Sequence, residues 1–267
     1  MFQKSIGFSV VEISHKRVDR PNPSVYYNHI HNHCEMLLFV TGKATYNIDG
    51  QMFTPSPYDL LFIPAAKYHY LMPTDSVPYE NYVIGIDPRI VQSEHYKNLF
   101  ASPLMLNIKN DSKLLDFFST LDFYERNYSE KDFAVCARAI VSEIITYCNY
   151  RKDSLISYHG ESLMLIEKII AFIDQNIEKP LDADVIASHF SFSKSYIQNT
   201  FSNHMHIGLK KYIMQKKIYS AYVDLSCGMT PNDVCEKYSF GDYSSFYRLY
   251  KSIFGIAPST NKQKPAD

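Results

Sequence analysis

Four side chains of types that commonly bind metals lie close together in the first third of the sequence. His29, His31 and Glu35 form a His-x-His-x3-Glu run, and His69 follows Pro64. Imidazole nitrogens and a carboxylate held on facing strands could bind iron, manganese, zinc or nickel. The same groups could instead line a pocket and hydrogen-bond to a small molecule, or could be surface or core histidines. We expect the pocket role, with no metal or other cofactor.

The same region is rich in tyrosine, whose ring is apolar and whose hydroxyl is polar. Such side chains suit a pocket that stacks on a sugar and hydrogen-bonds at its rim. The alternative is that half of them point outward from exposed strands. The tyrosines are Tyr26, Tyr27, Tyr46, Tyr68, Tyr70, Tyr79 and Tyr82. We predict a site for a sugar or another small polar molecule that is formed by His29, His31, Glu35, Tyr46, His69 and Tyr82.

Short strands separated by turn signals carry these residues over 1–87. The apolar or alternating runs end at Thr-Gly, Asp-Gly, proline or Asp-Pro, which stop strands and begin turns. These runs cover 36–40, 44–48, 60–63 and 79–86. Antiparallel strands at this spacing predict a sandwich or a small barrel.

The histidines and turns together resemble the two cupin motifs. The run His-x-His-x3-Glu-x6-Gly matches the first motif, and Pro64 with His69 matches part of the second. Tyr58 and Ala66 stand where the motifs have glycine, and Pro73 stands where they have asparagine. The resemblance implies that the histidines and the glutamate project into a barrel.

Residues 111–150 change to helical periodicity, with apolar side chains at steps of three and four. One stripe consists of Leu114, Leu115, Phe117, Phe118 and Leu121, and a second of Phe133, Ala137, Ile140, Ile144 and Tyr147. These helices could pack on the barrel or present a face to a second subunit. The polar segment 151–160 ends in glycine, which favours a domain boundary there.

A second group of candidate binding residues lies in a pattern that occurs twice within 181–258. Each copy places apolar residues at helical spacing on both sides of a polar residue, Ser193 in the first and Asp242 in the second. A side-chain oxygen at such a position can accept from the free N–H groups of a new helix. Asp182 and Thr230 are similar start signals for the preceding helices. The repeat therefore predicts two helix-turn-helix units, which a further helix joins.

Residues 161–262 resemble the tandem helix-turn-helix domain of the AraC/XylS transcription regulators. The resemblance rests on Leu181, Ile186, Ala187, Phe190, Ser193, Tyr196, Phe201, Tyr212, Ile218, Ala221, Phe240, Asp242, Ser244, Phe246, Arg248, Lys251, Gly255, Pro258 and Ser259. The chain departs from the family pattern at His206 and Ser239, where glycine is usual, at Lys217, where arginine is usual, and at Asn261, where an aromatic is usual. Regulators that resemble this chain commonly keep a His-x-His-x3-Glu run without a catalytic metal.

In a helix-turn-helix protein the second helix enters the major groove, and outward residues near its start contact base edges. The outward positions are Ser195, Gln198 and Asn199 in the first copy and Tyr243, Ser244, Tyr247 and Arg248 in the second. Gln and Asn can pair with adenine, and Arg with guanine. The residues expected to contact phosphate are Lys194, Lys210, Lys211, Lys217 and Lys251. The alternative is that these side chains form ordinary solvated helix faces.

The charge distribution supports a nucleic-acid contact, although the whole chain has a net charge of −1. From Lys194 to Lys264 there are 10 Lys or Arg against 4 Asp or Glu, a local excess of +6. Positive charge concentrated in one segment is what phosphate contact requires.

Composition places the chain among cytoplasmic globular proteins. No run approaches the roughly 20 apolar residues of a membrane span, and the first residues lack the apolar core of a secretion signal. The five cysteines, at 34, 136, 148, 227 and 235, have no paired metal spacing. We expect small buried thiols, including Cys227 and Cys235, rather than a redox sensor.

These patterns predict an α+β chain of two domains. An N-terminal antiparallel β-barrel of cupin or jelly-roll type, with following helices, precedes an all-α domain whose two helix-turn-helix units are joined by a helix. We expect an effector-binding barrel over 1–105, a helical dimerisation or linker region over 106–160 and a DNA-binding domain over 161–267.

The resemblance implies a transcription regulator, with activation as the family tendency, rather than an enzyme. Its expected partners are double-stranded promoter DNA, a small-molecule effector, RNA polymerase and a second copy of the chain, without a membrane. One alternative is a metal-dependent cupin enzyme, an isomerase or dioxygenase, fused to a DNA-binding domain. Another is a regulator without an effector, whose barrel only dimerises.

Overall fold

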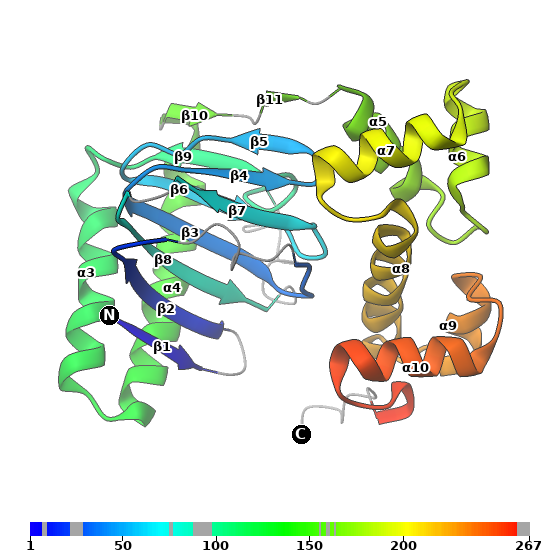
Figure 1. The fold of residues 1–267 in the computed structure, drawn as a ribbon. Helices are drawn as coiled ribbons and strands as arrows, with labels where there is room; N and C mark the ends of the chain where they lie inside the picture. The colour runs from blue at the N-terminus through cyan, green and yellow to red at the C-terminus, as the bar shows by residue number, and fades with distance from the viewer. Residues whose placement is uncertain are drawn as a thin grey trace. The chain divides into compact units, whose positions relative to one another are not determined.

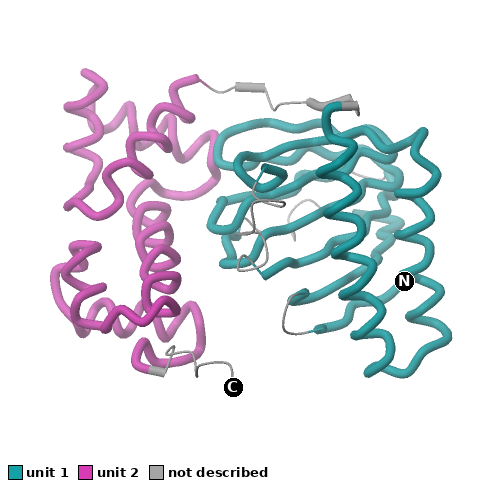
Figure 2. The backbone as a smooth tube through the Cα atoms, turned by 180° about the vertical axis from the view of Figure 1, so that it is seen from behind, with its two compact units in different colours: residues 1–162 teal, residues 163–267 magenta. Residues whose placement is uncertain are grey.

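The computed structural model describes residues 1–6, 10–21, 29–74, 77–87, 98–154, 156–158, 161–162 and 164–260. The chain divides into two compact units, Met1–Ser162 and Leu163–Asp267 (Figure 2). No helix in the described ranges is both long and apolar enough to cross a membrane. Tyr26 and Tyr27, two of the tyrosines that suit the predicted effector pocket, lie outside the described residues.

The first unit contains two antiparallel sheets (Figure 1). The seven-stranded sheet has the order β1 (Phe2–Ser5), β2 (Val10–Val18), β8 (Tyr79–Ile86), β3 (Cys34–Thr41), β6 (Asp59–Ile63), β9 (Leu104–Asn107) and β10 (Ile156–Tyr158). The four-stranded sheet has the order β11 (Glu161–Ser162), β5 (Gln51–Phe53), β4 (Ala44–Ile48) and β7 (His69–Pro73). The predicted α+β class and antiparallel strands are confirmed, but the sheets are open and do not close into one barrel.

Alternation along β3 divides the core of this unit into two layers. Leu37 and Phe39 belong to a cluster with Tyr46 and Phe53 from the four-stranded sheet. Their neighbours on the strand point the other way because successive side chains lie on opposite faces. Both faces of β3 are therefore buried, which explains why its sequence is an almost continuous apolar run.

Two helices, α3 (Ser112–Asn127) and α4 (Glu130–Arg151), cover the other face of the seven-stranded sheet (Figure 1). Both predicted apolar stripes contribute to the cluster that Met36 and Leu38 form on this face. Of the two alternatives for these helices, packing on the sheet is what the structure shows. A short 3-10 helix, Lys152–Ser154, follows α4.

The second unit contains the two predicted helix-turn-helix pairs. They are α6 (Ala183–Phe190) with α7 (Lys194–Met205), and α9 (Pro231–Lys237) with α10 (Tyr243–Phe254). The joining helix is α8 (Leu209–Ser226), α5 (Met164–Gln175) precedes the first pair, and a 3-10 helix, Pro258–Thr260, follows the second. The unit is thus built from one motif used twice (Figure 1).

Local hydrogen bonds start the helices at the positions that the sequence predicts. Ser193 accepts from the N–H of Tyr196 at 3.2 Å, and Asp242 accepts from the N–H of Ser245 at 2.8 Å. Asp182 and Thr230 cap α6 and α9 in the same way. These bonds satisfy N–H groups that have no partner within the helix, which fixes where each helix begins.

The cysteine prediction is only partly correct. All five thiols are free, and Cys34 and Cys148 are buried. Cys227 is exposed because it caps the end of α8, and Cys235 is partly exposed.

Candidate DNA interface and effector site

The outward face of α7 carries the first group of predicted base-reading residues. Ser195, Gln198 and Asn199 are all exposed, whereas Ile197 and Phe201 of the same helix are buried. Side chains from α7 and from the start of α8 surround a hollow of about 600 Å³, formed by Gln198, Asn199, Ser202, Gly208, Leu209, Lys210, Lys211 and Met214. The structure therefore brings two candidate base readers beside two candidate phosphate contacts.

The corresponding face of α10 carries the second group. Tyr243, Ser244 and Arg248 are exposed, and Tyr247 is partly exposed. The guanidinium of Arg248 donates to the Ser245 hydroxyl at 3.3 Å, which leaves most of its donors available. A hollow of about 430 Å³ lies at the start of this helix, lined by Asn232, Cys235, Glu236, Ser239, Gly241, Asp242 and Tyr243.

Four of the five lysines predicted to contact phosphate are exposed: Lys194, Lys210, Lys211 and Lys251. Lys194 pairs with Asp184 at 2.6 Å, an exposed pair that phosphate could replace because such pairs contribute little.

The fifth, Lys217, is a wrong prediction. Its side chain is buried, and its Nζ donates to the backbone carbonyls of Lys179 and Tyr238, both at 2.7 Å. It is not available to DNA in this structure.

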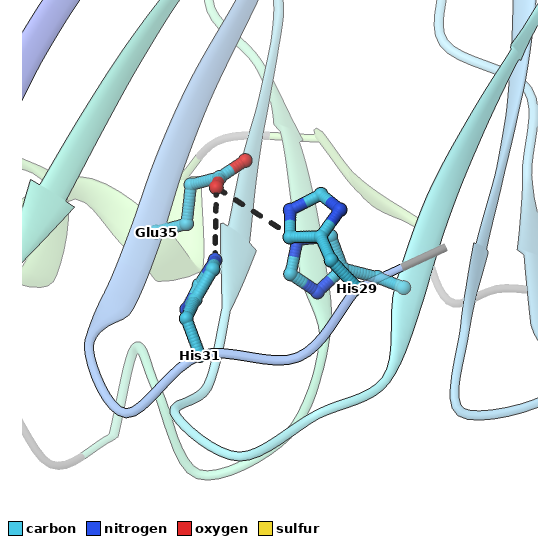
Figure 3. A group of neighbouring side chains, drawn as sticks. His29, His31 and Glu35 are labelled. Carbon is cyan, nitrogen blue, oxygen red and sulfur yellow. Dashed lines mark hydrogen bonds and ion pairs between the residues drawn. The ribbon is translucent and has the colours of Figure 1, made fainter. Parts of the chain in front are cut away.

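The predicted histidine cluster of the first unit does come together. Ligand-type atoms of His29, His31, Glu35 and His69 all lie within 4.8 Å of one another. Glu35 projects from β3 and His69 from β7, so the two sheets contribute one residue each. Backbone hydrogen bonds of 3.0 Å in both directions join His29 to His69. The imidazole of His31 points at the Glu35 carboxylate (Figure 3), with Nε2 and Oε2 3.2 Å apart.

Backbone carbonyls orient two of the imidazoles. Nδ1 of His31 is 2.8 Å from the carbonyl oxygen of His33, and Nδ1 of His69 is 2.9 Å from that of Lys67. A carbonyl can only accept, so each Nδ1 carries the proton and donates it. Each Nε2 is then directed toward Glu35, at 3.2 Å for His31 and 3.8 Å for His69. The cluster therefore presents two imidazole Nε2 atoms and one carboxylate to a common centre.

Burial and charge oppose each other at Glu35 and His69. Burial favours the neutral carboxylic acid, but the hydrogen bond of His31 and the charge of His69 prevail and hold the pKa of Glu35 well below its ordinary value. Burial also favours neutral His69, yet the facing Glu35 carboxylate raises the pKa of this imidazole. The two shifts have a common cause, because each group stabilises the charged form of the other.

The two tyrosines of the predicted site lie on opposite faces of the sheet system. Tyr46 is buried in the layer between the sheets and lies on the same face of its sheet as His69, since both face inward with Ile48. Tyr82 pairs with Leu38, which faces the helices, and its hydroxyl donates to Asp122 of α3 at 2.7 Å. Tyr82 is therefore a wrong prediction for this site.

The remaining tyrosines of this set contradict the alternative that half of them are exposed. Tyr68, Tyr70 and Tyr79 are buried, as are Tyr46 and Tyr82, which are all of the predicted tyrosines within the described residues. Tyrosine enrichment in this chain reflects core packing on both faces of the large sheet at least as much as a pocket.

Sequence reasoning missed two further histidines. His33 stacks on His31 with ring centroids 3.7 Å apart, and burial followed by the neighbouring His31 lowers the pKa of His33 to about 4. The repeated His-x-His step could have indicated it. His15 lies 2.8 Å from both Asp122 and Glu80, and no sequence pattern links it to a residue 107 positions away.

Comparison with protein-family models gives two matches on this chain. Residues 12–119 match the model described as an AraC-like ligand binding domain. Residues 186–264 match the model described as a helix-turn-helix domain. The two matches fall on the two structural units, and each covers the site described above for its unit.

Named relatives are similar to part of this chain. The regulatory protein SoxS of Escherichia coli (strain K12) is 31% identical over 101 residues, which are 38% of this chain and 94% of SoxS. The HTH-type transcriptional activator AarP of Providencia stuartii is 30% identical over 96 residues, or 36% of this chain and 71% of AarP. A structure of ToxT from Vibrio cholerae covers 95% of this chain and 97% of its own, with 16% identity and a TM-score of 0.40. The chain belongs to the AraC family of transcription regulators, with an AraC-like ligand-binding domain followed by a helix-turn-helix DNA-binding domain.

Proposed function

We propose that this protein binds specific promoter sequences under the control of a small effector held between the two sheets of the first unit. The observation that carries the proposal is the pair of capped recognition helices, α7 and α10, whose exposed faces carry side chains able to read base edges. The local excess of +6 between Lys194 and Lys264 supports the same reading.

The contacts follow from the geometry of each recognition helix. We assign base contacts to Ser195, Gln198, Asn199, Tyr243, Ser244, Tyr247 and Arg248. Phosphate contacts fall to Lys194, Lys210, Lys211 and Lys251. The lysines hold the register of the protein on the duplex, and the base contacts supply sequence preference. Two recognition helices on one unit would enter successive major-groove segments, about 34 Å apart along the duplex.

The effector site of this proposal is formed by His29, His31, Glu35, Tyr46 and His69. A buried carboxylate accepts hydrogen bonds from hydroxyl groups, and the imidazoles can donate or accept, which suits a sugar or another small polar molecule. Such a ligand changes DNA binding only if it binds one conformation of the chain more tightly than another.

A divalent transition-metal ion is the second candidate ligand of this site. Three histidines and one glutamate within 4.8 Å form a donor set that zinc, iron, manganese or nickel accepts. The Nδ1 bonds of His31 and His69 to backbone carbonyls are the kind of outer contact that orients metal-binding imidazoles. A bound metal would supply a fixed positive charge, and His29, His31, Glu35 and His69 would hold it.

We also propose that the protein is cytoplasmic and acts as a homodimer. In this form it contacts RNA polymerase, and it has no enzymatic activity. The support for a dimer is apolar exposure on α3 and α4, where Phe123, Val135 and Tyr150 are 53%, 60% and 83% exposed. The support for a regulator without catalysis is that the relatives above are named as regulators.

Selection of bound fragments from a random duplex library, at two salt concentrations, tests DNA recognition. A discrete motif with two half-elements about one helical turn apart is expected. Binding without a motif, weakening steeply with salt, would contradict sequence recognition and leave only phosphate attraction.

Metal analysis combined with thermal unfolding separates the two effector candidates. Stoichiometric metal that is lost in His69→Ala and retained in His204→Gln, which removes an exposed histidine of α7, would favour a metal. If the protein carries no metal, a polar effector should raise the midpoint of thermal unfolding of the wild type and not of His69→Ala. A chain that neither binds metal nor is stabilised by any of a panel of sugars would contradict an effector site at this cluster.

A further inference from the structure

Lys217 lies in the middle of α8, the helix that joins the two helix-turn-helix units, and its side chain is only 2% exposed. Its Nζ donates to the carbonyl oxygens of Lys179 and Tyr238, both at 2.7 Å. Lys179 lies between α5 and α6, just before the first helix-turn-helix pair, and Tyr238 caps the end of α9 in the second pair. One ammonium group of α8 therefore links the segment that leads into the first pair to the turn of the second pair.

Two neighbouring contacts join the same segments. The Ser239 hydroxyl donates to the carbonyl oxygen of Glu178 at 2.7 Å. Nζ of Lys237 lies 2.8 Å from Asp224 of α8 and 3.5 Å from the Glu178 carboxylate. Ser239 has a left-handed backbone with φ of +53°, a conformation that favours glycine, and glycine could not make the bond to Glu178. Residues 178–179 and 237–239 thus form a junction that is held from both sides.

A buried ammonium with backbone acceptors is a short, strong and directional contact. Hydrogen bonds to charged donors are stronger than neutral ones, and a buried charge without its acceptors is costly. Both carbonyls lie in segments between helices rather than inside helices. These bonds therefore constrain how the two helix-turn-helix pairs are oriented about α8. The orientation of α10 relative to α7 depends on that constraint.

We propose that Lys217, supported by Ser239, is a positioning residue that fixes the second recognition helix relative to the first and so sets the spacing between the two DNA half-elements. This inference rests on the proposed DNA-reading function. Lys217 itself does not contact DNA. Its contribution is that the protein binds DNA with one separation of the two half-elements much more tightly than DNA with a slightly shorter or longer separation. The reason is that a rigid pair of helices can enter two grooves in only one register.

Binding selection from a random duplex library with the full chain tests this. Wild type should recover one spacing and discriminate about tenfold or more against a one-base-pair insertion between the half-elements. Lys217→Met, which keeps an unbranched side chain one atom shorter and removes its donors, should recover several spacings and lose most of that discrimination. Lys217→Arg retains donors and should restore one spacing.

Lys216→Met is the matched control. Lys216 is adjacent, also buried at 7% exposure, and its Nζ pairs with Asp174 of α5 at 2.9 Å. Its loss should lower stability without changing the spacing preference, whereas a purely structural role for Lys217 would make the two variants alike. A folded Lys217→Met protein with one spacing and unchanged discrimination would overturn the proposal.

Residual dipolar couplings of the full chain test the junction without DNA. Amides of α6 and α7 and those of α9 and α10 should fit one alignment tensor in wild type and require two in Lys217→Met. A single tensor in that variant would overturn the proposal. If Lys217→Met does not fold, Ser239→Gly replaces it, because glycine relieves the positive φ and removes the hydrogen bond to Glu178. This variant should broaden the spacing preference to a smaller degree. An unchanged spacing preference together with a single alignment tensor would again refute the proposal. If wild type recovers no motif, DNA reading fails as a proposal while the couplings still decide the junction.

Discussion

Replacing Glu35 by glutamine tests the electrostatic account of the histidine cluster, because it removes one charge and keeps the shape. Glu35 is buried and its carboxylate lies 3.8 Å from Nε2 of His69. Two unit charges at this distance attract by about 4 kcal/mol at an effective dielectric constant of about 20. Desolvation offsets part of this attraction, so we expect Glu35→Gln to lower the free energy of unfolding by about 3 kcal/mol when His69 is charged.

The loss should depend on pH in a defined direction. The folded-state pKa of His69 is raised above its ordinary 6.5, so its stabilising effect is complete below about pH 6.5 and disappears as pH rises through the folded value. The pKa of Glu35 lies well below its ordinary 4.5, so its effect is present above about pH 4.5 and is lost as pH falls through the folded value. The difference between wild type and variant should therefore be largest between about pH 4.5 and 6.5, and should become smaller as the pH rises above that range.

Urea unfolding in the presence of a chelator, at about pH 5.5 and about pH 9, measures this difference. Hydrogen exchange of peptides from β3 and β7 should also report it, because Glu35 lies on β3 and His69 on β7. In a His69→Gln background the further change Glu35→Gln should cost much less at the lower pH. An equal loss of stability at both pH values would refute the ion-pair account and leave only a packing role.

Arg248→Ala should cost about 1–3 kcal/mol of DNA affinity and relax the preference at one base pair. Lys251→Ala should instead weaken binding to all sequences alike and reduce the slope of log affinity against log salt concentration by about one. Titrations of single-site operator variants at several salt concentrations measure both. An equal loss on every sequence for Arg248→Ala would make that residue a phosphate contact. Ser193→Ala should lower the free energy of unfolding of the second unit by about 1 kcal/mol, since it removes the cap of α7, as urea unfolding can show. Phe246→Ala should cost about 3–5 kcal/mol by the same measurement, because Phe246 is fully buried, and a loss under about 1 kcal/mol would contradict its place in the core.

The parts of the structure that could be predicted from the sequence are those that short segments decide. Ser193 and Asp242 cap helices through N–H groups two or three residues away, so their types and positions were sufficient to place α7 and α10. The alternation of buried and exposed positions likewise indicated which faces of these helices are free. The His-x-His-x3-Glu run and His69 were also recognisable, because their residue types and spacing resemble the two cupin motifs.

The wrong predictions for Lys217, for Tyr82 and for a closed barrel concern partners that are distant in sequence. Helical periodicity places Lys217 on a face with Lys210, and only the approach of Lys179 and Tyr238 shows that it is enclosed. Strand alternation cannot tell which face of β8 meets α3, and that choice sends Tyr82 to Asp122 rather than to the histidines. Whether the sheets close is decided by edge pairing, which leaves two open sheets here.

The sequence by itself determined the family, the two helix-turn-helix units and the outward residues of the recognition helices, because local hydrogen bonds and periodicity are encoded within a few residues. Only the tertiary structure decided that Glu35 and His69 share a charge pair across two sheets and that Lys217 links the segment before α6 to the end of α9. The physical reason is that a buried charge is stabilised by groups brought to it from elsewhere in the chain, and no local pattern specifies where those groups will be.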